Sequence, residues 1–249
     1  MKDAIRSLNR AHYSDETRFY STADLRPVEV RLIDSVAPHR RILDVGCGAG
    51  RVTHRLAEAG HHVTGIDLVP ETVNAARNAF AGLNLDLHVG DMCAMPFESD
   101  MFDEVWCLRF SFNALGSREE RVQALREMKR VCKPGGRLLV ESFNYLYPGR
   151  FGLMWAANLT DELSRWLRIL AGSPAPRLPR GDILYLASKA EHAAPGYAHL
   201  PTSRELEDLC NEASLEGATV GAAEHPFGLF RHRLPLGYSI WIRGGKGGV

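Results

Sequence analysis

Short apolar runs alternate with helical patterns along the first 142 residues, and this alternation limits the possible folds more than any other feature of the chain. Each run has the length of a buried strand, and each is separated from the next by a helical pattern or a long loop. The runs are Arg41–Val45, His62–Asp67, Leu85–Val89, Asp103–Leu108 and Arg137–Ser142. Strands connected in this way pair in parallel, so the sequence predicts an α/β fold with a doubly wound, mostly parallel sheet.

Helical patterns fill several of the gaps between these strands. One helix is predicted over Arg51–Ala59, where Gly60 ends it, and a second runs from Pro70 to about Ala81. A third, Arg118–Val131, carries apolar residues at the three- and four-residue spacing of one helical face.

The last fifty residues predict the end of the same domain. A helix over Ser203–Ala213 is followed by two strands, near Gly217–Glu224 and Leu236–Arg243. The connection between these strands is short enough for an antiparallel pair.

Residues 146–201 interrupt the alternation of strands and helices. No strand is expected there, six of the 13 prolines fall there, and apolar residues from Trp155 to Leu170 recur every three or four positions. We therefore expect a helical cap inserted into a single domain that spans residues 1–249.

Composition narrows the function classes and the compartment. Thirty basic and 30 acidic side chains balance, so nothing in the net charge indicates a nucleic-acid partner. The N-terminus has no apolar leader, and no apolar stretch is long enough to predict a membrane span. Five cysteines without a CxxC pair favour neither disulfides nor a structural zinc, and they suit a cytoplasmic protein.

The glycine loop that follows the first strand is the strongest sign of a ligand. Asp44-Val-Gly-Cys-Gly-Ala-Gly50 makes a tight turn in which the backbone can approach a bound molecule. The dinucleotide pattern G-x-G-x-x-G fails because position 51 is Arg. Asp44 would repel a pyrophosphate and attract a cationic ligand.

Two further acids follow the next strands. Asp67 ends the second strand, where a carboxylate can accept hydrogen bonds from both hydroxyls of a ribose. Asp91 follows the third strand and can accept from an exocyclic amine such as that of adenine, with Met92 packing on the ring. A helix cap or a turn is the alternative for Asp67 and would be the preferred interpretation of Asp91 taken alone. The presence of all three acids favours a ligand role for Asp91.

Five segments together resemble the successive motifs of class I S-adenosylmethionine-dependent methyltransferases, and most closely the small-molecule group called methyltransferase type 11. They are ILDVGCGAG, VTGID, GDMCAMPF, FDEVWCL and LREMKRVCKPGGRLLV. The resemblance covers Arg41–Ser142 well and continues weakly through HLPTSRELEDLCNEASLEG.

The resemblance implies a Rossmann-like seven-stranded sheet with an antiparallel final strand, and S-adenosylmethionine as the cofactor. The methionine part would lie at the glycine loop, the ribose at Asp67 and the adenine at Asp91. The residues implied to form the cofactor site are Asp44, Gly46, Cys47, Gly48, Asp67, Leu68, Asp91, Met92, Leu108 and Arg109. An N-terminal tyrosine would close over the cofactor, and we favour Tyr20 slightly over Tyr13.

Methyl transfer from a sulfonium is an in-line displacement, so a general base is needed only when the acceptor must lose a proton. His225 follows the sixth strand, which should run parallel to the first five, and it is the preferred base. His199 and Glu141 rank lower as candidates. The remaining histidines and the charged run 118–121 are expected on the surface.

Other chemistries are disfavoured. Leu-Arg-Phe-Ser-Phe stands where amino-methyltransferases of DNA bases carry Asn/Asp-Pro-Pro-Tyr/Phe, and the acids Glu119 and Glu120 begin a helix instead of forming a guanidinium-binding loop. The spacing of His and carboxylate residues predicts no metal site.

The sequence thus predicts a cytoplasmic enzyme that methylates an O, N or C atom of a small aromatic or partly apolar molecule, as in quinone or specialised-metabolite biosynthesis. The aromatic residues that could meet such an acceptor are Trp155, Trp166, Tyr185, Tyr197, Phe227 and Phe230. The two tryptophans could equally seat the cap helix on the domain, so the tyrosines and phenylalanines are the preferred acceptor contacts. A NAD(P)-dependent oxidoreductase and a non-catalytic S-adenosylmethionine-binding protein are the alternatives. The acceptor, its reacting atom and the oligomeric state stay open.

Overall fold

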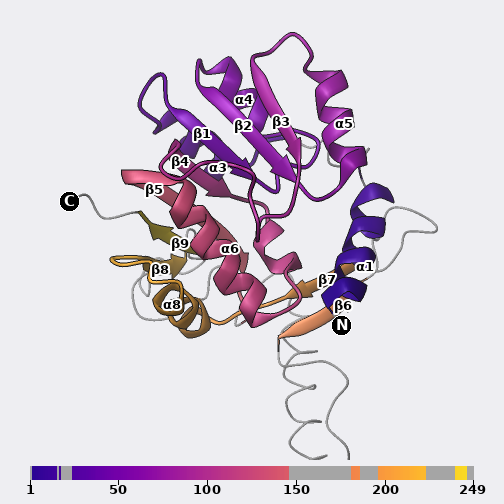
Figure 1. Ribbon diagram of the computed structural model, residues 1–249, viewed down its shortest axis with the longest axis vertical. Coiled ribbons are helices and arrows are strands. Elements are labelled where there is room, and N and C mark those ends of the chain that lie inside the picture. Colours follow the sequence, from indigo (N-terminus) through magenta and orange to yellow (C-terminus); the bar gives the residue numbers. More distant parts are fainter. Residues whose placement is uncertain are drawn as a thin grey trace, which may run out of the picture.

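The core of the protein is a seven-stranded sheet with the order β3-β2-β1-β4-β5-β9-β8 (Figure 1). The computed structural model describes residues 2–15, 17, 24–145, 181–185, 196–222 and 239–245. The strands are β1 (Arg41–Val45), β2 (His62–Asp67), β3 (Leu85–Val89), β4 (Phe102–Cys107), β5 (Cys132–Phe143), β8 (Thr219–Ala222) and β9 (Ser239–Gly244). The predicted strands are all present, with ends that shift by a few residues.

The directions of the strands follow the prediction. β1 to β5 pair in parallel, whereas β9 pairs antiparallel with both β5 and β8. β8 therefore runs in the same direction as β5. The carboxyl ends of all the parallel strands lie at one edge of the sheet, which is where such folds bind ligands.

Helices cover both faces of the sheet. They are α1 (Lys2–Asp15), α3 (Pro27–Asp34), α4 (Thr53–Glu58), α5 (Pro70–Ala79), α6 (Arg118–Val131) and α8 (Ser203–Glu212), with a short 3-10 helix, η1 (Ser111–Ala114). The sequence pattern predicts no element in the first forty residues, where α1 and α3 form.

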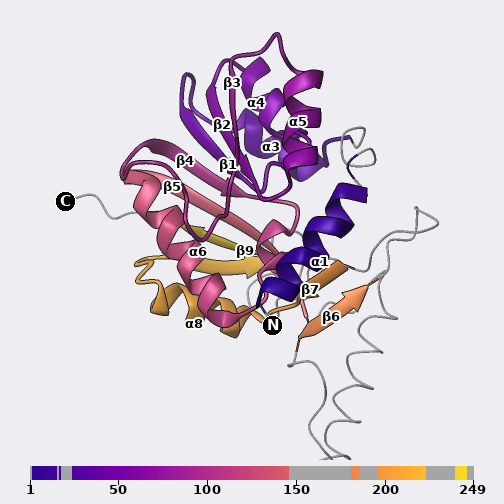
Figure 2. The same ribbon diagram turned by 45° about the vertical axis from the view of Figure 1, so that its right-hand side comes forward.

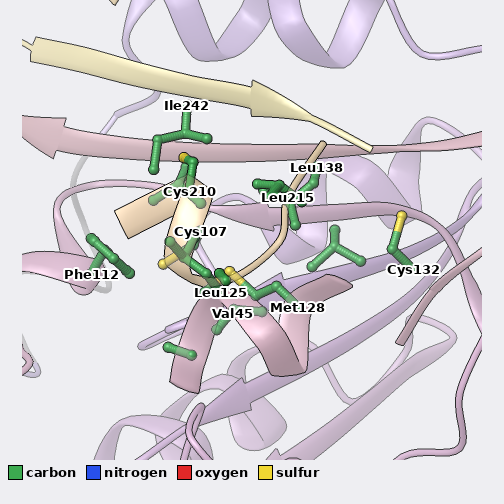
Figure 3. Packing of buried hydrophobic residues seen from close by; sticks show 14 of the residues in the cluster. Val45, Cys107, Phe112, Leu125, Met128, Cys132, Leu138, Cys210, Leu215 and Ile242 are labelled. Atoms are coloured by element: carbon green, nitrogen blue, oxygen red, sulfur yellow. The ribbon is translucent and has the colours of Figure 1, made fainter. Parts of the chain in front are cut away.

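Successive side chains of each strand enter two different cores. Val105 and Cys107 of β4 pack with α6 and α8, as does Ile242 of β9 (Figure 3). Trp106 and Trp241, from the same two strands, pack on the other face with α3 and α4. This period-two alternation fixes the register, because a shift of one residue would exchange the two cores.

The expectation that residues 146–201 contain no strand is wrong. β6 (Asp182–Tyr185) and β7 (Gly196–His199) form a two-stranded antiparallel sheet beside α1 (Figure 2). All four residues of β7 are buried, so the alternation of apolar and polar residues that would reveal a strand is missing. Residues 146–180 and 186–195, which include Trp155 and Trp166, lie outside the described residues, and the helical cap stays a prediction.

His199 ties this small sheet to the main body. Its Nδ1 lies 2.6 Å from Asp182 Oδ1 and its Nε2 lies 2.8 Å from Glu205 Oε1 on α8. Ionised carboxylates only accept hydrogen bonds, so both ring nitrogens must carry a proton. Burial alone would lower the pKa of His199, but the hydrogen bonds to the two acids outweigh it and raise the pKa above 6.5. Arg121, which lies 3.9 Å from Glu205, opposes this increase, because its positive charge lowers the pKa of His199.

Replacing His199 should therefore destabilise the protein in a pH-dependent way. Because the folded pKa is raised, the stabilisation is complete below pH 6.5 and is lost as the pH rises through the folded pKa. We expect His199→Gln to lower the free energy of unfolding by roughly 1–3 kcal/mol at pH 6 and by less at pH 9. Urea denaturation of both proteins at the two pH values measures this, and an equal loss at both would contradict an imidazolium.

Candidate functional site

A cleft opens at the carboxyl edge of β1, β2 and β4, beside the loop after β3, and α1 forms its opposite wall. The sequence-predicted residues that line it are Tyr13, Asp44, Gly46, Cys47, Gly48, Asp67, Leu68, Asp91, Met92, Leu108 and Arg109. The fold thus brings together every predicted cofactor-site residue except Tyr20, which lies outside the described residues.

The glycine loop has the backbone conformation that its composition predicts. Gly46 and Gly48 adopt φ of +74° and +52°. A Cβ on Gly46 would lie 2.4 Å from the Ser111 Cβ, whereas a Cβ on Gly48 would meet only open space. The loop is therefore closely packed at Gly46 and open to a ligand at Gly48.

The amide groups of Gly46, Cys47, Gly48 and Gly50 are already bonded within the protein. Gly46 N donates to Ile66 O at 2.7 Å, and Gly48 N donates to Asp67 Oδ2 at 2.8 Å. A ligand at this loop would therefore donate hydrogen bonds to the carbonyl oxygens of the loop. Acceptors suit an ammonium group, such as that of methionine.

Asp44 is a carboxylate at the end of β1 with only 3% of its surface exposed. Burial raises its pKa to about 6, although a 2.7 Å hydrogen bond from the Thr53 hydroxyl and the charge of Arg51 act in the other direction. A buried carboxylate with so high a pKa is stabilised in its ionised form by any cation that enters the cleft. The site therefore favours a positively charged ligand.

Asp67 keeps capacity for a ligand although both of its oxygens are engaged. Oδ2 accepts from Gly48 N and Oδ1 accepts from Val69 N at 2.9 Å. Burial raises the pKa of Asp67, and these backbone hydrogen bonds oppose the shift. An ionised carboxylate has about four lone-pair sites, so the side chain keeps acceptor capacity beyond these two backbone hydrogen bonds.

Asp91 has a charged partner that the sequence analysis missed. Its Oδ1 accepts from Cys93 N at 2.9 Å, and its Oδ2 lies 2.9 Å from Arg6 Nη2 on α1. Arg6, Arg10 and Tyr13 all line the cleft at helical spacing. The sequence shows that these residues share one helical face, but only the structure shows that this face lines the cleft.

Arg109 follows β4 in an unusual backbone conformation. Arg109 and Phe110 have φ of +53° and +68°, in the left-handed region that bulky residues rarely adopt. Glu141 of β5 holds this turn by accepting from Arg109 N at 2.9 Å, and it is ion-paired with Arg26. The fully buried Glu141 is thereby committed to structural contacts, which disfavours its use as a base.

His225 lies outside the described residues, so its role stays a prediction. Its strand, β8, runs in the expected direction but forms the edge of the sheet, three strand spacings or roughly 14 Å from β4. His199 has both ring nitrogens bonded to carboxylates and has no lone pair with which to accept a proton.

Several surface expectations are wrong. Glu120 and Arg121 from the charged run are buried, and so are His12 and His61. The Tyr197 ring is also fully buried, which excludes it from contact with an acceptor. Glu120 bonds to the nearby Gly116 N and Arg121 to the nearby Leu115 O, whereas their charged partners, Arg6 and Glu205, come from distant parts of the chain.

Among the described residues, no group of three or more His, Cys, Asp or Glu side chains could hold a metal ion. No helix in that part of the chain is long and apolar enough to cross a membrane.

Comparison with known proteins agrees with this geometry. Residues 42–136 match the family model described as a methyltransferase domain. The demethylmenaquinone methyltransferase of Tropheryma whipplei is 35% identical over 147 residues, which are 56% of each chain. The 27-O-demethylrifamycin SV methyltransferase of Amycolatopsis mediterranei is 31% identical over 64% of this chain and 59% of its own. The matched part thus spans little more than half the length of these curated relatives.

A solved structure shows the same fold over nearly the whole chain. The SAM-dependent methyltransferase of Methanosarcina mazei superposes with a TM-score of 0.65 at 22% identity, covering 91% of this chain and all of that one. Residues 42–136 thus match a methyltransferase domain, and the chain has the fold of a solved S-adenosylmethionine-dependent methyltransferase. S-adenosylmethionine is the cofactor that these matches imply, and the carbonyl oxygens of the glycine loop, Asp44 and Asp67 fit its ammonium, sulfonium and ribose groups.

Asp44 should make binding of the methyl donor pH-dependent. With a pKa of about 6, it is ionised above that value and neutral below it, so affinity for the cationic S-adenosylmethionine should fall as the pH drops from 7 to 5. Asp44→Asn should bind more weakly and lose this dependence. Its stability above pH 6 should rise, because ionised Asp44 costs folding energy there. Calorimetry and thermal unfolding at both pH values test the two effects.

Asp67→Asn should weaken binding of the methyl donor by about tenfold or more. The amide oxygen replaces only one of two accepting oxygens, while Gly48 N and Val69 N still compete for it. The measurement is the dissociation constant of the folded variant, and an unchanged value would show that Asp67 serves only the loop.

Proposed function

We propose that this protein transfers the methyl group of S-adenosylmethionine to an O, N or C atom of a small aromatic or partly apolar molecule. The observation that carries the proposal is the row of acids at the carboxyl edge of the sheet. Asp44 and Asp67 lie at the carboxyl ends of β1 and β2, Asp91 follows β3, and all three line one cleft. Their order matches the cationic, ribose and adenine parts of the methyl donor.

The bound cofactor supplies an electrophilic methyl group on a positively charged sulfur. The work of the chain is to align this group with the acceptor. Asp44 offers negative charge at the end of β1, and Asp67 offers two acceptors for the ribose. Leu108 and Arg109, just past β4, border the side from which an acceptor would approach.

An aromatic pair next to Arg109 supports a flat acceptor. Phe110 and Phe143 stack with ring centroids 3.8 Å apart at an angle of 12°, and the Arg26 guanidinium lies 5.6 Å from the centre of the Phe110 ring. Both rings are partly exposed at the ends of β4 and β5. The names of the two curated relatives point to a quinone and a rifamycin as their acceptors, and we extend an aromatic acceptor to this chain on that basis.

The proton of a hydroxyl acceptor would need a base. His225, in the segment that follows β8, is our candidate base. Phe227 and Phe230, in the same segment, are our candidate acceptor contacts. A cytoplasmic location is part of the proposal, because five free thiols suit a reducing compartment. So is a small-molecule acceptor in place of a nucleic acid, because the net charge is zero.

The proposal is tested by binding first and turnover second. S-adenosylhomocysteine should bind in calorimetry and NAD should not. The protein should then transfer label from methyl-labelled S-adenosylmethionine to at least one member of a panel containing a reduced 1,4-naphthoquinone, a catechol and a hydroxylated aromatic acid.

Asp67→Asn serves as the matched control, since it should lower transfer through its effect on methyl-donor binding. Binding without transfer to any acceptor in a metabolite extract would favour the non-catalytic alternative. Binding of NAD without S-adenosylhomocysteine would overturn the proposal.

A further inference from the structure

One guanidinium nitrogen reaches two carboxylates at the Asp91 end of the cleft. Arg6 Nη2 lies 2.9 Å from Asp91 Oδ2 and 2.8 Å from Glu120 Oε1. The three side chains come from α1, the loop after β3 and the first turn of α6, and all line the cleft. Arg6 lies outside residues 42–136, the part of the chain that matches the family model.

Both carboxylates are held in place by backbone groups. Glu120 Oε2 accepts from Gly116 N at 3.0 Å, and its side chain is only 6% exposed. Asp91 Oδ1 accepts from Cys93 N. The Cys93 thiol adds no charge near neutral pH, because burial and the two acids raise its pKa to about 12.

Arg6 therefore decides the charge balance of this end of the cleft. With Arg6, two negative charges and one positive charge leave a single net negative charge, which suits a ligand that donates hydrogen bonds. Without it, two fixed carboxylates would face each other, one of them buried and without its cation. The repulsion would push Asp91 away from its present position.

The position of α1 does not rest on Arg6 alone. Asn9 is 4% exposed, donates to Ala114 O at 2.9 Å and accepts from Tyr197 N at 2.8 Å. The helix thus keeps an uncharged anchor to η1 and to β7 if Arg6 is replaced. This separates the electrostatic role of Arg6 from the packing of the helix.

We propose that Arg6 is a positioning residue of the methyl-donor site, which holds Asp91 against Glu120 in the geometry that meets the adenine amine. The inference rests on the proposed function, because it takes the cleft to bind the methyl donor. Under this proposal α1 is part of the methyl-donor site, because the positive charge of Arg6 holds Asp91.

The test measures S-adenosylhomocysteine binding by calorimetry in the full-length protein. Arg6→Met should raise the dissociation constant about tenfold, or about 1.4 kcal/mol. Adding Glu120→Gln to this variant should restore most of the affinity, since only one carboxylate then remains. If Arg6 merely seats α1, the second substitution brings no recovery.

Arg118→Met is the matched control. Arg118, in the first turn of α6, is ion-paired with Glu212 of α8, and the substitution breaks this pair. Both side chains are exposed, and neither lines the cleft. The dissociation constant of this variant should equal that of the parent. Arg6→Gln, which keeps hydrogen-bond donors without the charge, replaces Arg6→Met if that variant does not fold.

The outcomes separate this inference from the proposed function. A parent protein that does not bind S-adenosylhomocysteine refutes the methyl-donor site itself. A parent that binds, with an Arg6→Met variant that binds equally well or is not rescued by Glu120→Gln, refutes the role of Arg6 alone.

Discussion

A nearly buried carboxylate, Asp44, is the constraint on which the rest of the site depends. Such a group is costly to bury, and the structure places alternating charges behind it. Arg51 lies next to Asp44 and makes two hydrogen bonds, of 2.7 and 2.6 Å, to Glu29 of α3. Glu29 in turn pairs with Arg26, which pairs with Glu141 of β5. Two positive and two negative side chains thus compensate one another beneath the cleft.

This network extends from the end of β1 to the turn that follows β4, along the sheet edge of the cleft. At one end it faces Asp44 and the glycine loop, and at the other Glu141 holds Arg109 N in a strained left-handed turn. Strain of this kind persists only where surrounding contacts fix it, and it concentrates at functional sites. The buried charges that compensate Asp44 therefore also hold the Arg109 turn, which borders the expected acceptor.

The segments outside the matched family region complete the site. α1 lines the cleft and supplies Arg6 and Tyr13. β7 lies beside α1 (Figure 2), and the backbone of Tyr197 anchors the helix through Asn9. His199 then fixes the two-stranded sheet to α8 through paired acids.

The sequence by itself determined the strands, their order of connection and the three acids that end them, because each rests on a local pattern of apolar residues, glycines and turns. Only the tertiary structure decided the role of α1, the strands β6 and β7, and the burial of Glu120, Arg121 and Tyr197. These depend on partners far along the chain: Tyr197 N bonds to Asn9, 188 residues away, and Arg6 meets Asp91 and Glu120 across the cleft. The sequence around a polar side chain does not indicate whether such a partner will contact it in the fold. Burial and ion pairing are properties of the assembled fold, and the local pattern that builds a strand does not encode them.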